Sequence, residues 1–166
     1  MCNGGRLRAR LATEGCRTMR NTTSRVIICL LALLVPVGSA FAYDPIGTWY
    51  TAGNRAQVRI AHCGRGTLCG GIVWLKDPKD PKTGKPWTDI NNSDSTKRTR
   101  PLIGVLIVLD LALSNAPNKW RGQVYNADDG RTYSGYLTMF DPDALELKGC
   151  VLGGIICRSE TWTRAR

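Results

Sequence analysis

Charged and aromatic side chains alternate with small hydroxyl residues at the end of the chain, in the stretch CRSETWTR. The alternate positions hold Arg158, Glu160, Trp162 and Arg164. Successive residues of a β-strand point to opposite faces, so these four side chains would share one face. If that face points inward, the protein keeps charges in its interior, where desolvation makes an unpaired charge costly.

Two kinds of role fit an inward Arg158 and Glu160. In a functional role, the guanidinium group binds the anionic head of a ligand, or stabilises an anion while Glu160 works as a general acid or base. In a structural role, the two side chains form an ion pair that ties strands together. Three aromatic residues fall on expected inward positions and would line such a cavity: Tyr133, Trp120 and Trp74.

Other chemistry is sparse in this sequence. His62 is the only histidine, which argues against a histidine-based zinc site and against a Ser-His-Asp triad. The chain contains neither a G-x-G-x-x-G motif nor a phosphate-binding loop, and NADDG is typical of a hairpin turn. We therefore expect no metal and no cofactor, and we favour binding over catalysis.

The N-terminus has the pattern of an export signal. From residue 19, a basic segment with Arg20 and Arg25 precedes an apolar run over 26–37, and Ala40-Phe41-Ala42 forms an A-x-A cleavage signal. Residues 1–18 are interpreted as a start-site extension, 19–42 as a signal peptide and 43–166 as a single domain. The alternative is an uncleaved anchor, but the run is shorter than the roughly 20 residues of a membrane span. The sequence thus predicts a periplasmic or secreted protein.

The charge of the exported part is modest. The whole chain has 23 Lys+Arg and 13 Asp+Glu, and residues 1–42 contain six and one of these, which leaves 17 against 12. The lysines of 76–85 are interleaved with aspartates, as in a solvated loop rather than a basic stripe. We expect no nucleic-acid partner and contact with a membrane only through the transient signal peptide. The sequence does not specify an oligomeric state.

Short apolar segments separated by turn signals predict an all-β fold. The expected strands lie near 47–51, 57–61, 68–76, 102–111, 119–125, 131–139, 145–150 and 155–164. Consecutive hairpins favour an up-and-down antiparallel barrel of eight strands, with a sandwich as the alternative. Closing the sheet into a barrel removes exposed strand edges, and eight strands leave room for packed side chains or one small ligand.

Four cysteines remain after the leader: Cys63, Cys69, Cys150 and Cys157. An even number of cysteines in an exported domain predicts two disulfides. In an up-and-down barrel, the first two lie at the opposite end from the last two. A disulfide needs Cα atoms within about 7 Å, so pairing of neighbours along the sequence is favoured over pairing across the barrel.

This pairing orients the last strand. Leu145 and Leu147 alternate with charged residues and are expected to point inward, which turns Cys150 outward. A partner at Cys157 must then also point outward, and counting by twos places Arg158 and Glu160 on the inner face. A β-bulge would reverse this assignment.

A polar, proline-rich stretch over 77–100 interrupts the strands. Loops of this length within compact domains are usually functional or disordered. It would lie at the end of the barrel away from Trp49, where it can form a lid. Asp89, Asn91 and Asn92 can order it through side-chain bonds to the backbone. An ordered lid and a flexible loop remain open at this point.

The ends of the domain resemble those of lipocalin-like (calycin) proteins, in which a first-strand Trp packs against an Arg of the last strand. The residues concerned are GTW with Trp49 and the terminal TWTR with Trp162 and Arg164. The chain is also similar to the bacterial family called domain of unknown function 2147. The matching stretches include DPIGTWYT, LCGGIVWLKD, GKPWTDINN and KWRGQVYNADDGRTYSGYL. The resemblance implies an exported barrel and supplies no catalytic residue.

These patterns favour one function over two others. The first is an exported lipocalin-like module that binds a small, partly apolar ligand, anionic if it pairs with Arg158. The alternatives are an enzyme that uses the Arg158/Glu160 pair and an envelope protein that uses its outer face to interact with a partner.

Overall fold

The computed structural model describes residues 42–166. The predictions of a start-site extension and a signal peptide fall almost wholly on residues outside this range. Within it, no helix is long and apolar enough to cross a membrane. Residues 42–166 form the predicted barrel.

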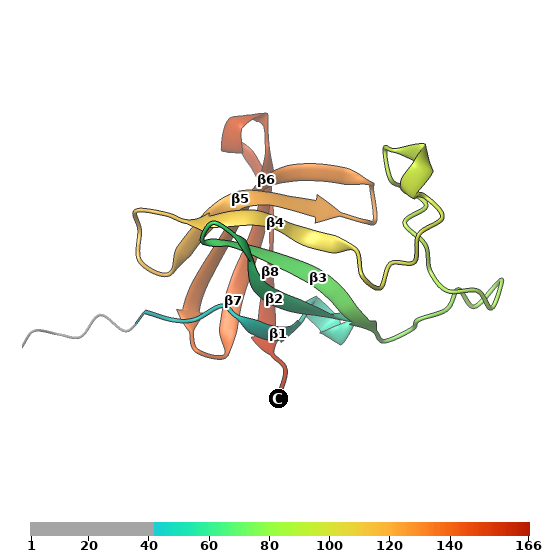
Figure 1. Ribbon diagram of the computed structural model, residues 1–166, viewed down its shortest axis with the longest axis horizontal. Helices are drawn as coiled ribbons and strands as arrows, with labels where there is room; N and C mark the ends of the chain where they lie inside the picture. Colours follow the sequence, from blue (N-terminus) through green and yellow to red (C-terminus); the bar gives the residue numbers. More distant parts are fainter. Residues whose placement is uncertain (1–41) are drawn as a thin grey trace, which may run out of the picture. The chain divides into compact units, whose positions relative to one another are not determined.

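Eight antiparallel strands close into a barrel in sequence order, which confirms the predicted fold (Figure 1). The strands are β1 (Gly47–Tyr50), β2 (Ala56–Gly64), β3 (Thr67–Leu75), β4 (Leu106–Leu113), β5 (Lys119–Asn126), β6 (Arg131–Asp141), β7 (Ala144–Val151) and β8 (Ile156–Arg164). Three short 3-10 turns accompany them: η1 (Ala52–Asn54), η2 (Ser95–Lys97) and η3 (Leu152–Gly154). We call the end at which the described chain enters β1 and leaves β8 the base, and the opposite end, with the β1–β2, β3–β4, β5–β6 and β7–β8 links, the mouth.

The barrel interior is filled by apolar side chains through its base and middle. Every strand contributes at least one inward-facing residue to this core. Its buried members are Trp49, Val58, Ile60, Leu68, Ile72, Val108, Leu111, Trp120, Leu137, Met139, Leu145 and Trp162. A ligand that enters the barrel is therefore limited to the mouth.

The barrel closes through a short seam between its first and last strands. β1 has only four residues and pairs with β8 at Trp49↔Arg164 and Tyr50↔Thr163. β8 has seven further residues towards the mouth, and they pair with β7 alone. The upper part of β8 is thus a free sheet edge, and charged side chains that point inward protect such edges from pairing with other chains.

A β-bulge in β3 reverses the expected direction of Trp74. Val58 pairs with Ile72, whereas the preceding Gln57 pairs with Trp74, so Val73 is the extra residue. The bulge moves Trp74 to the outer face, where its ring packs edge-on against Tyr50. The prediction that Trp74 points inward is therefore wrong, and Trp74 does not line the interior.

Both predicted disulfides are confirmed. Cys63 is bonded to Cys69, and Cys150 to Cys157. The second bridge joins directly opposed residues of β7 and β8, at the point where the hairpin leaves the barrel wall. Its register fixes the inner and outer faces of both strands.

Candidate functional site at the mouth of the barrel

Arg158 and Glu160 lie on the inner face of the sheet but are not buried. Glu160 is opposite Leu147 and Arg158 is opposite Gly149, two and four residues above the buried Leu145↔Trp162 pair. Both charged residues are nevertheless exposed. The expectation that these two charges lie buried in the interior is wrong, because β1 is too short to cover this part of β8. The two charges face the open mouth.

Glu160 makes only loose contacts in the mouth. Its carboxylate lies 3.9 Å from the guanidinium of Arg55, which reaches across from the β1–β2 link. The indole Nε1 of Trp162 donates a hydrogen bond of 3.4 Å to the other carboxylate oxygen. Exposed ion pairs of this kind contribute little to stability. Arg158 has no salt bridge among residues 42–166, so its guanidinium remains available.

Tyr133 forms part of the wall next to Arg158. It points inward from β6 opposite the buried Val124, and its ring lies against Gly149, where an added Cβ would be 3.4 Å from the Tyr133 Cβ. Its hydroxyl donates a hydrogen bond to Asp129 in the β5–β6 turn. That bond to a carboxylate, followed by desolvation, raises the pKa of Tyr133. The ring therefore presents a neutral, half-buried surface to the mouth.

The other predicted aromatic residues belong to the framework. Trp120 is buried in the core and does not project into an interior cavity. The ring of Trp49 lies under Arg164, with 4.2 Å between its centroid and Cζ. Trp162 packs beside them in the core.

Arg164 joins three segments at the base. Its guanidinium donates hydrogen bonds to the carbonyl oxygens of Pro142, Ile46 and Asp44, at 2.8, 2.9 and 2.8 Å. An added Cβ on Gly47 would lie 2.6 Å from the Arg164 Nη1, and Gly47 has a φ of +143°. Arg164 is thus a structural clamp at the end opposite the mouth.

The β3–β4 loop is ordered by a buried carboxylate. Asp89 is fully buried. It accepts hydrogen bonds from the Tyr125 hydroxyl at 2.5 Å, from Asn92 at 2.7 Å and from Arg100 at 3.0 and 2.7 Å. Bonds of this kind to a buried charge are strong when every lone pair is used. The sequence predicts that the Asp89 side chain bonds to backbone, and this expectation is wrong because all its partners are side chains.

The pKa values of Asp89 and Tyr125 define the pH range over which their hydrogen bond persists. Burial raises the pKa of Asp89, but the bonds from Tyr125, Asn92 and Arg100 together outweigh it, so this pKa lies below the usual 3.8. Burial, and then the bond to Asp89, raise the pKa of Tyr125 from 10.0 to about 12. Both groups keep their present protonation states at neutral pH, with Asp89 charged and Tyr125 neutral.

The loop is fixed to the neighbouring β5–β6 turn. Asn91 donates a side-chain hydrogen bond of 2.9 Å to the carbonyl of Asp128. Gly130 packs so closely on the loop that an added Cβ would overlap the carbonyl oxygen of Asn91, 1.7 Å away. Together with the Tyr125 bonds, these contacts attach the loop to the mouth end of the barrel. Of the two alternatives for residues 77–100, an ordered lid or a flexible loop, the structure therefore agrees with the ordered one.

A groove lies on the outside of the barrel, not within it. It has a volume of about 410 Å³ and runs over the outer faces of β5, β6 and β7 up to Gly154 and Cys157. Its polar lining includes Arg121, Lys148 and Glu146, with Lys119 at its lower end. The Arg121 guanidinium lies 5.8 Å from the centroid of the Tyr136 ring. This groove is predominantly basic.

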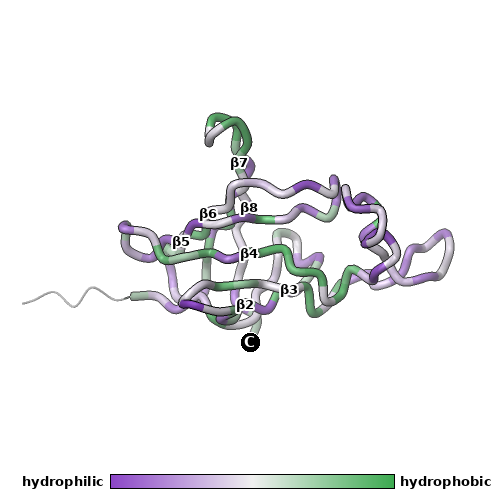
Figure 2. Tube along the Cα trace, turned by 45° about the horizontal axis from the view of Figure 1, so that its top comes forward, coloured by the Kyte–Doolittle hydropathy of each residue, from purple (hydrophilic) through white to green (hydrophobic). Residues whose placement is uncertain are grey.

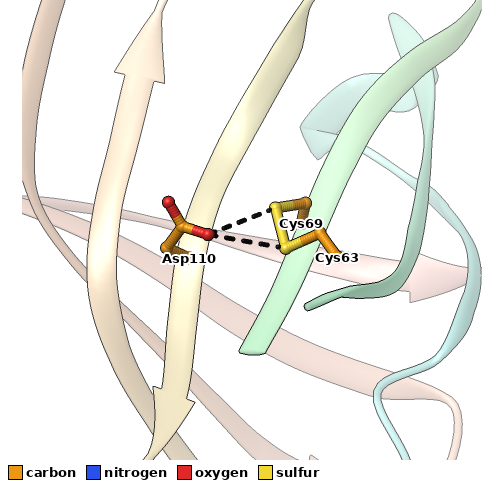
Figure 3. Close-up of side chains that lie close together, drawn as sticks. All are labelled: Cys63, Cys69 and Asp110. Carbon is orange, nitrogen blue, oxygen red and sulfur yellow. Dashed lines mark hydrogen bonds between the residues drawn. A yellow bond between two sulfur atoms is a disulfide. The ribbon is translucent and has the colours of Figure 1, made fainter. Parts of the chain in front are cut away.

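A carboxylate lies against the Cys63–Cys69 bridge (Figure 3). One oxygen of Asp110 is 3.6 Å from the sulfur of Cys63 and 3.8 Å from that of Cys69. Asp110 adopts a φ of +49° in an irregular part of β4, which turns its side chain towards the bridge. These three residues could hold a metal only if both cysteines were reduced to thiolates, because a disulfide sulfur carries no negative charge. In the bonded form the group is a surface staple.

Three structural features were not expected from the sequence: the Tyr125–Asp89–Arg100 cluster, the outer groove and the apolar end of the β7–β8 hairpin. The first joins residues from separate strands and loops, so only the polar stretch around Asp89 hinted at it. The last had a direct signal, because VLGGII combines four aliphatic residues with a turn.

Comparisons with known proteins agree with this geometry. The model of a family described as "Uncharacterized protein conserved in bacteria (DUF2147)" matches residues 47–164. Among curated proteins, none matches the chain. A similar solved structure is protein HP1028 from the human pathogen Helicobacter pylori, described as belonging to the lipocalin family. It has 21% identity and a TM-score of 0.62, and the match covers 75% of this chain and 84% of HP1028.

Proposed function

We propose that this chain, which belongs to the bacterial DUF2147 family and has a lipocalin-like barrel, is an exported module that binds a small ligand at the barrel mouth. The two disulfides fit an oxidising compartment outside the cytoplasm. The site consists of Arg158 and Glu160, with Tyr133 and Leu147 as its walls.

One observation carries the proposal: the inner face changes character along β8. Trp162 is buried in the filled core, whereas Glu160 and Arg158, on the same face, are exposed above it. Polar groups above an apolar floor are the usual composition of small-ligand sites. A filled base and an open, charged mouth therefore favour a shallow site for a short ligand over a deep lipocalin cavity.

The residues of the mouth define the ligand class. The Arg158 guanidinium presents a planar fork of donors that suits a carboxylate or phosphate. Leu147 and the Tyr133 ring offer apolar surface beside it. The ligand that fits best is a small anion with a short apolar tail. The Glu160 carboxylate repels the anionic group, which is therefore kept on the Arg158 side of the mouth.

The geometry supports binding more than catalysis. A general acid or base at neutral pH needs a carboxylate whose pKa is tuned by burial or by close partners. Glu160 is exposed and its cationic partner Arg55 is distant, at 3.9 Å. Nothing in the mouth excludes water from Glu160.

The proposal is tested with hexanoate, a carboxylate with a short apolar tail, as the probe anion. Titration followed by ¹H–¹⁵N NMR should shift the amide signals of Tyr133, Gly149 and Arg158. The change Arg158→Gln should weaken binding about tenfold, because it removes a charge-assisted hydrogen bond. Native mass spectrometry of protein purified from its own host should reveal the natural ligand.

Arg59→Gln is the matched control. Arg59 is exposed on the outer face of β2, so its loss changes the net charge equally without touching the mouth. Hexanoate affinity should be unchanged in this variant. Equal weakening by both variants, or signal shifts confined to the outer face, would refute binding at the mouth.

A further inference from the structure

The β7–β8 hairpin ends in an exposed apolar segment, which we call the tip and define as residues 151–156, VLGGII. Its exposed fractions are 38% for Val151, 70% for Leu152, 83% for Ile155 and 58% for Ile156. The tip projects away from the barrel wall, and Figure 2 shows it as the strongly hydrophobic end of the hairpin. Contiguous exposed apolar surface of this kind usually marks an interaction site.

The tip has a fixed shape. The Cys150–Cys157 disulfide closes the hairpin directly below it. Leu152 has a φ of +51°, a conformation in which Gly or Asn is usual, and Gly153 and Gly154 follow with positive φ. The turn therefore displays a large apolar side chain at a position that local backbone preference would give to a small one.

Cations border the tip, and acids lie farther away. Below the bridge, Lys148 is on the outer face of β7 and Arg158 is on the inner face of β8. The acidic residues of this hairpin, Glu146 and Glu160, lie two residues farther from the tip in each strand. The basic outer groove also reaches the hairpin, with Arg121 and Lys148 in its wall and Gly154 and Cys157 at its upper end.

We propose that the tip docks the protein on a membrane surface that contains anionic phospholipids. The four aliphatic side chains enter the boundary between headgroups and acyl chains, while Lys148 and the outer groove contact the headgroup phosphates. A fluid bilayer can accommodate a projecting apolar segment that is bordered by cations. A protein partner would need a pocket of matching shape for the same segment, so the bilayer is the better fit. This docking is independent of the mouth ligand and adds a membrane contact beyond the transient signal peptide.

Docking of this kind is weak and needs both the apolar tip and the cations beside it. Four partly inserted side chains give only marginal binding, as a single acyl chain does, so the cations must contribute. Binding should therefore require anionic lipid and should fall as ionic strength rises.

Vesicle sedimentation tests the proposal with protein expressed from the full chain. The wild type should sediment with vesicles that contain phosphatidylglycerol and much less with phosphatidylcholine vesicles. The double variant Leu152→Asn, Ile155→Ser should lower the partition coefficient about tenfold. Its melting temperature should be unchanged because both side chains are exposed and Asn tolerates positive φ. Lys148→Gln should weaken binding to the anionic vesicles alone.

The matched control is Leu113→Ser, Phe140→Ser. These residues are 65% and 55% exposed and lie near the base. This variant should bind vesicles like the wild type, and any contribution of residues 1–42 is common to all proteins compared. Equal loss in both double variants, equal binding to the two lipid compositions, or no sedimentation of the wild type would overturn the proposal. The proposal would also be overturned if the wild type formed a dimer that the tip variant does not form, and if the wild type did not bind vesicles.

Discussion

Replacing Trp49 with alanine is expected to lower the free energy of unfolding by about 3–5 kcal/mol, the usual cost of removing a buried large aromatic side chain. Trp49 has no exposed surface, and its Nε1 donates a hydrogen bond of 2.9 Å to the Pro45 carbonyl. It also supports the Arg164 guanidinium, 4.2 Å from its ring centroid. Because domains of this size have about 5–15 kcal/mol of stability, this change would remove a large part of it. Urea unfolding followed by far-UV circular dichroism measures the loss.

Trp74→Ala provides the comparison for Trp49. Trp74 is 40% exposed on the outer face, and its contact with Tyr50 is an edge-on ring pair. We expect a loss of about 1 kcal/mol, in the range measured for such pairs. If Trp49→Ala does not fold, Trp49→Phe keeps an aromatic ring at this position and loses the hydrogen bond to Pro45 and part of the buried volume. Equal costs for Trp49→Ala and Trp74→Ala would contradict the structural role of the base.

Replacing Asp89 with asparagine is expected to release the β3–β4 loop. The change leaves the Arg100 guanidinium without its anion and presents an amide to the Tyr125 hydroxyl. Breaking a buried pair costs about 3–5 kcal/mol, and the lower limit applies because Arg100 is partly exposed. Hydrogen exchange measured by mass spectrometry should show faster exchange over 77–105 and unchanged exchange in the strands.

Acid should reproduce the effect of Asp89→Asn. The pKa of Asp89 is lower in the folded loop than the usual 3.8, so protonation favours the opened loop. The stabilisation is complete above about pH 4 and is lost as the pH falls through the folded value. At the alkaline side, the pKa of Tyr125 is raised to about 12, so its contribution is complete below pH 10.0 and disappears as the pH approaches 12.

Asp94→Asn is the control within the same loop. Asp94 is partly exposed, bonds to Thr96 and pairs with Lys97 at 3.1 Å. Its replacement should leave the exchange of 77–105 almost unchanged. If acid opened the loop equally in the wild type and in Asp89→Asn, a carboxylate other than Asp89 would control the transition.

Local patterns in the sequence determined the strands, their order and the disulfides. Alternation in Leu145–Cys150 fixed which residues of β7 face inward, and the Cys150–Cys157 bond carried that assignment to Arg158 and Glu160. The sequence correctly predicted that Arg158 and Glu160 lie on the inner face, but the prediction that they are buried was wrong. Burial depends on how far β1 extends beside β8, and alternation within β8 contains no information about that length.

Bulges and loop contacts escaped prediction for a similar reason. The extra residue at Val73 is visible only in the pairing of β2 with β3, so counting by twos placed Trp74 on the wrong face. Asp89 and Tyr125 are far apart in the sequence, and their bond forms only when the β3–β4 loop folds over the β5–β6 turn. Such features arise from non-local contacts, which a local pattern does not encode.

The short seam between β1 and β8 has a consequence for folding kinetics. Other strand pairs join neighbours along the chain, whereas Trp49↔Arg164 closes a loop that spans the whole barrel. Contacts of high sequence separation form late because loop closure is entropically costly. Seam substitutions such as Arg164→Lys should therefore accelerate unfolding in stopped-flow chevrons and leave the refolding rate almost unchanged. Slower refolding would instead place the seam in the transition state. If the seam closes late in folding, its contacts control the unfolding rate. The four residues of β1 would then determine how long the barrel stays folded.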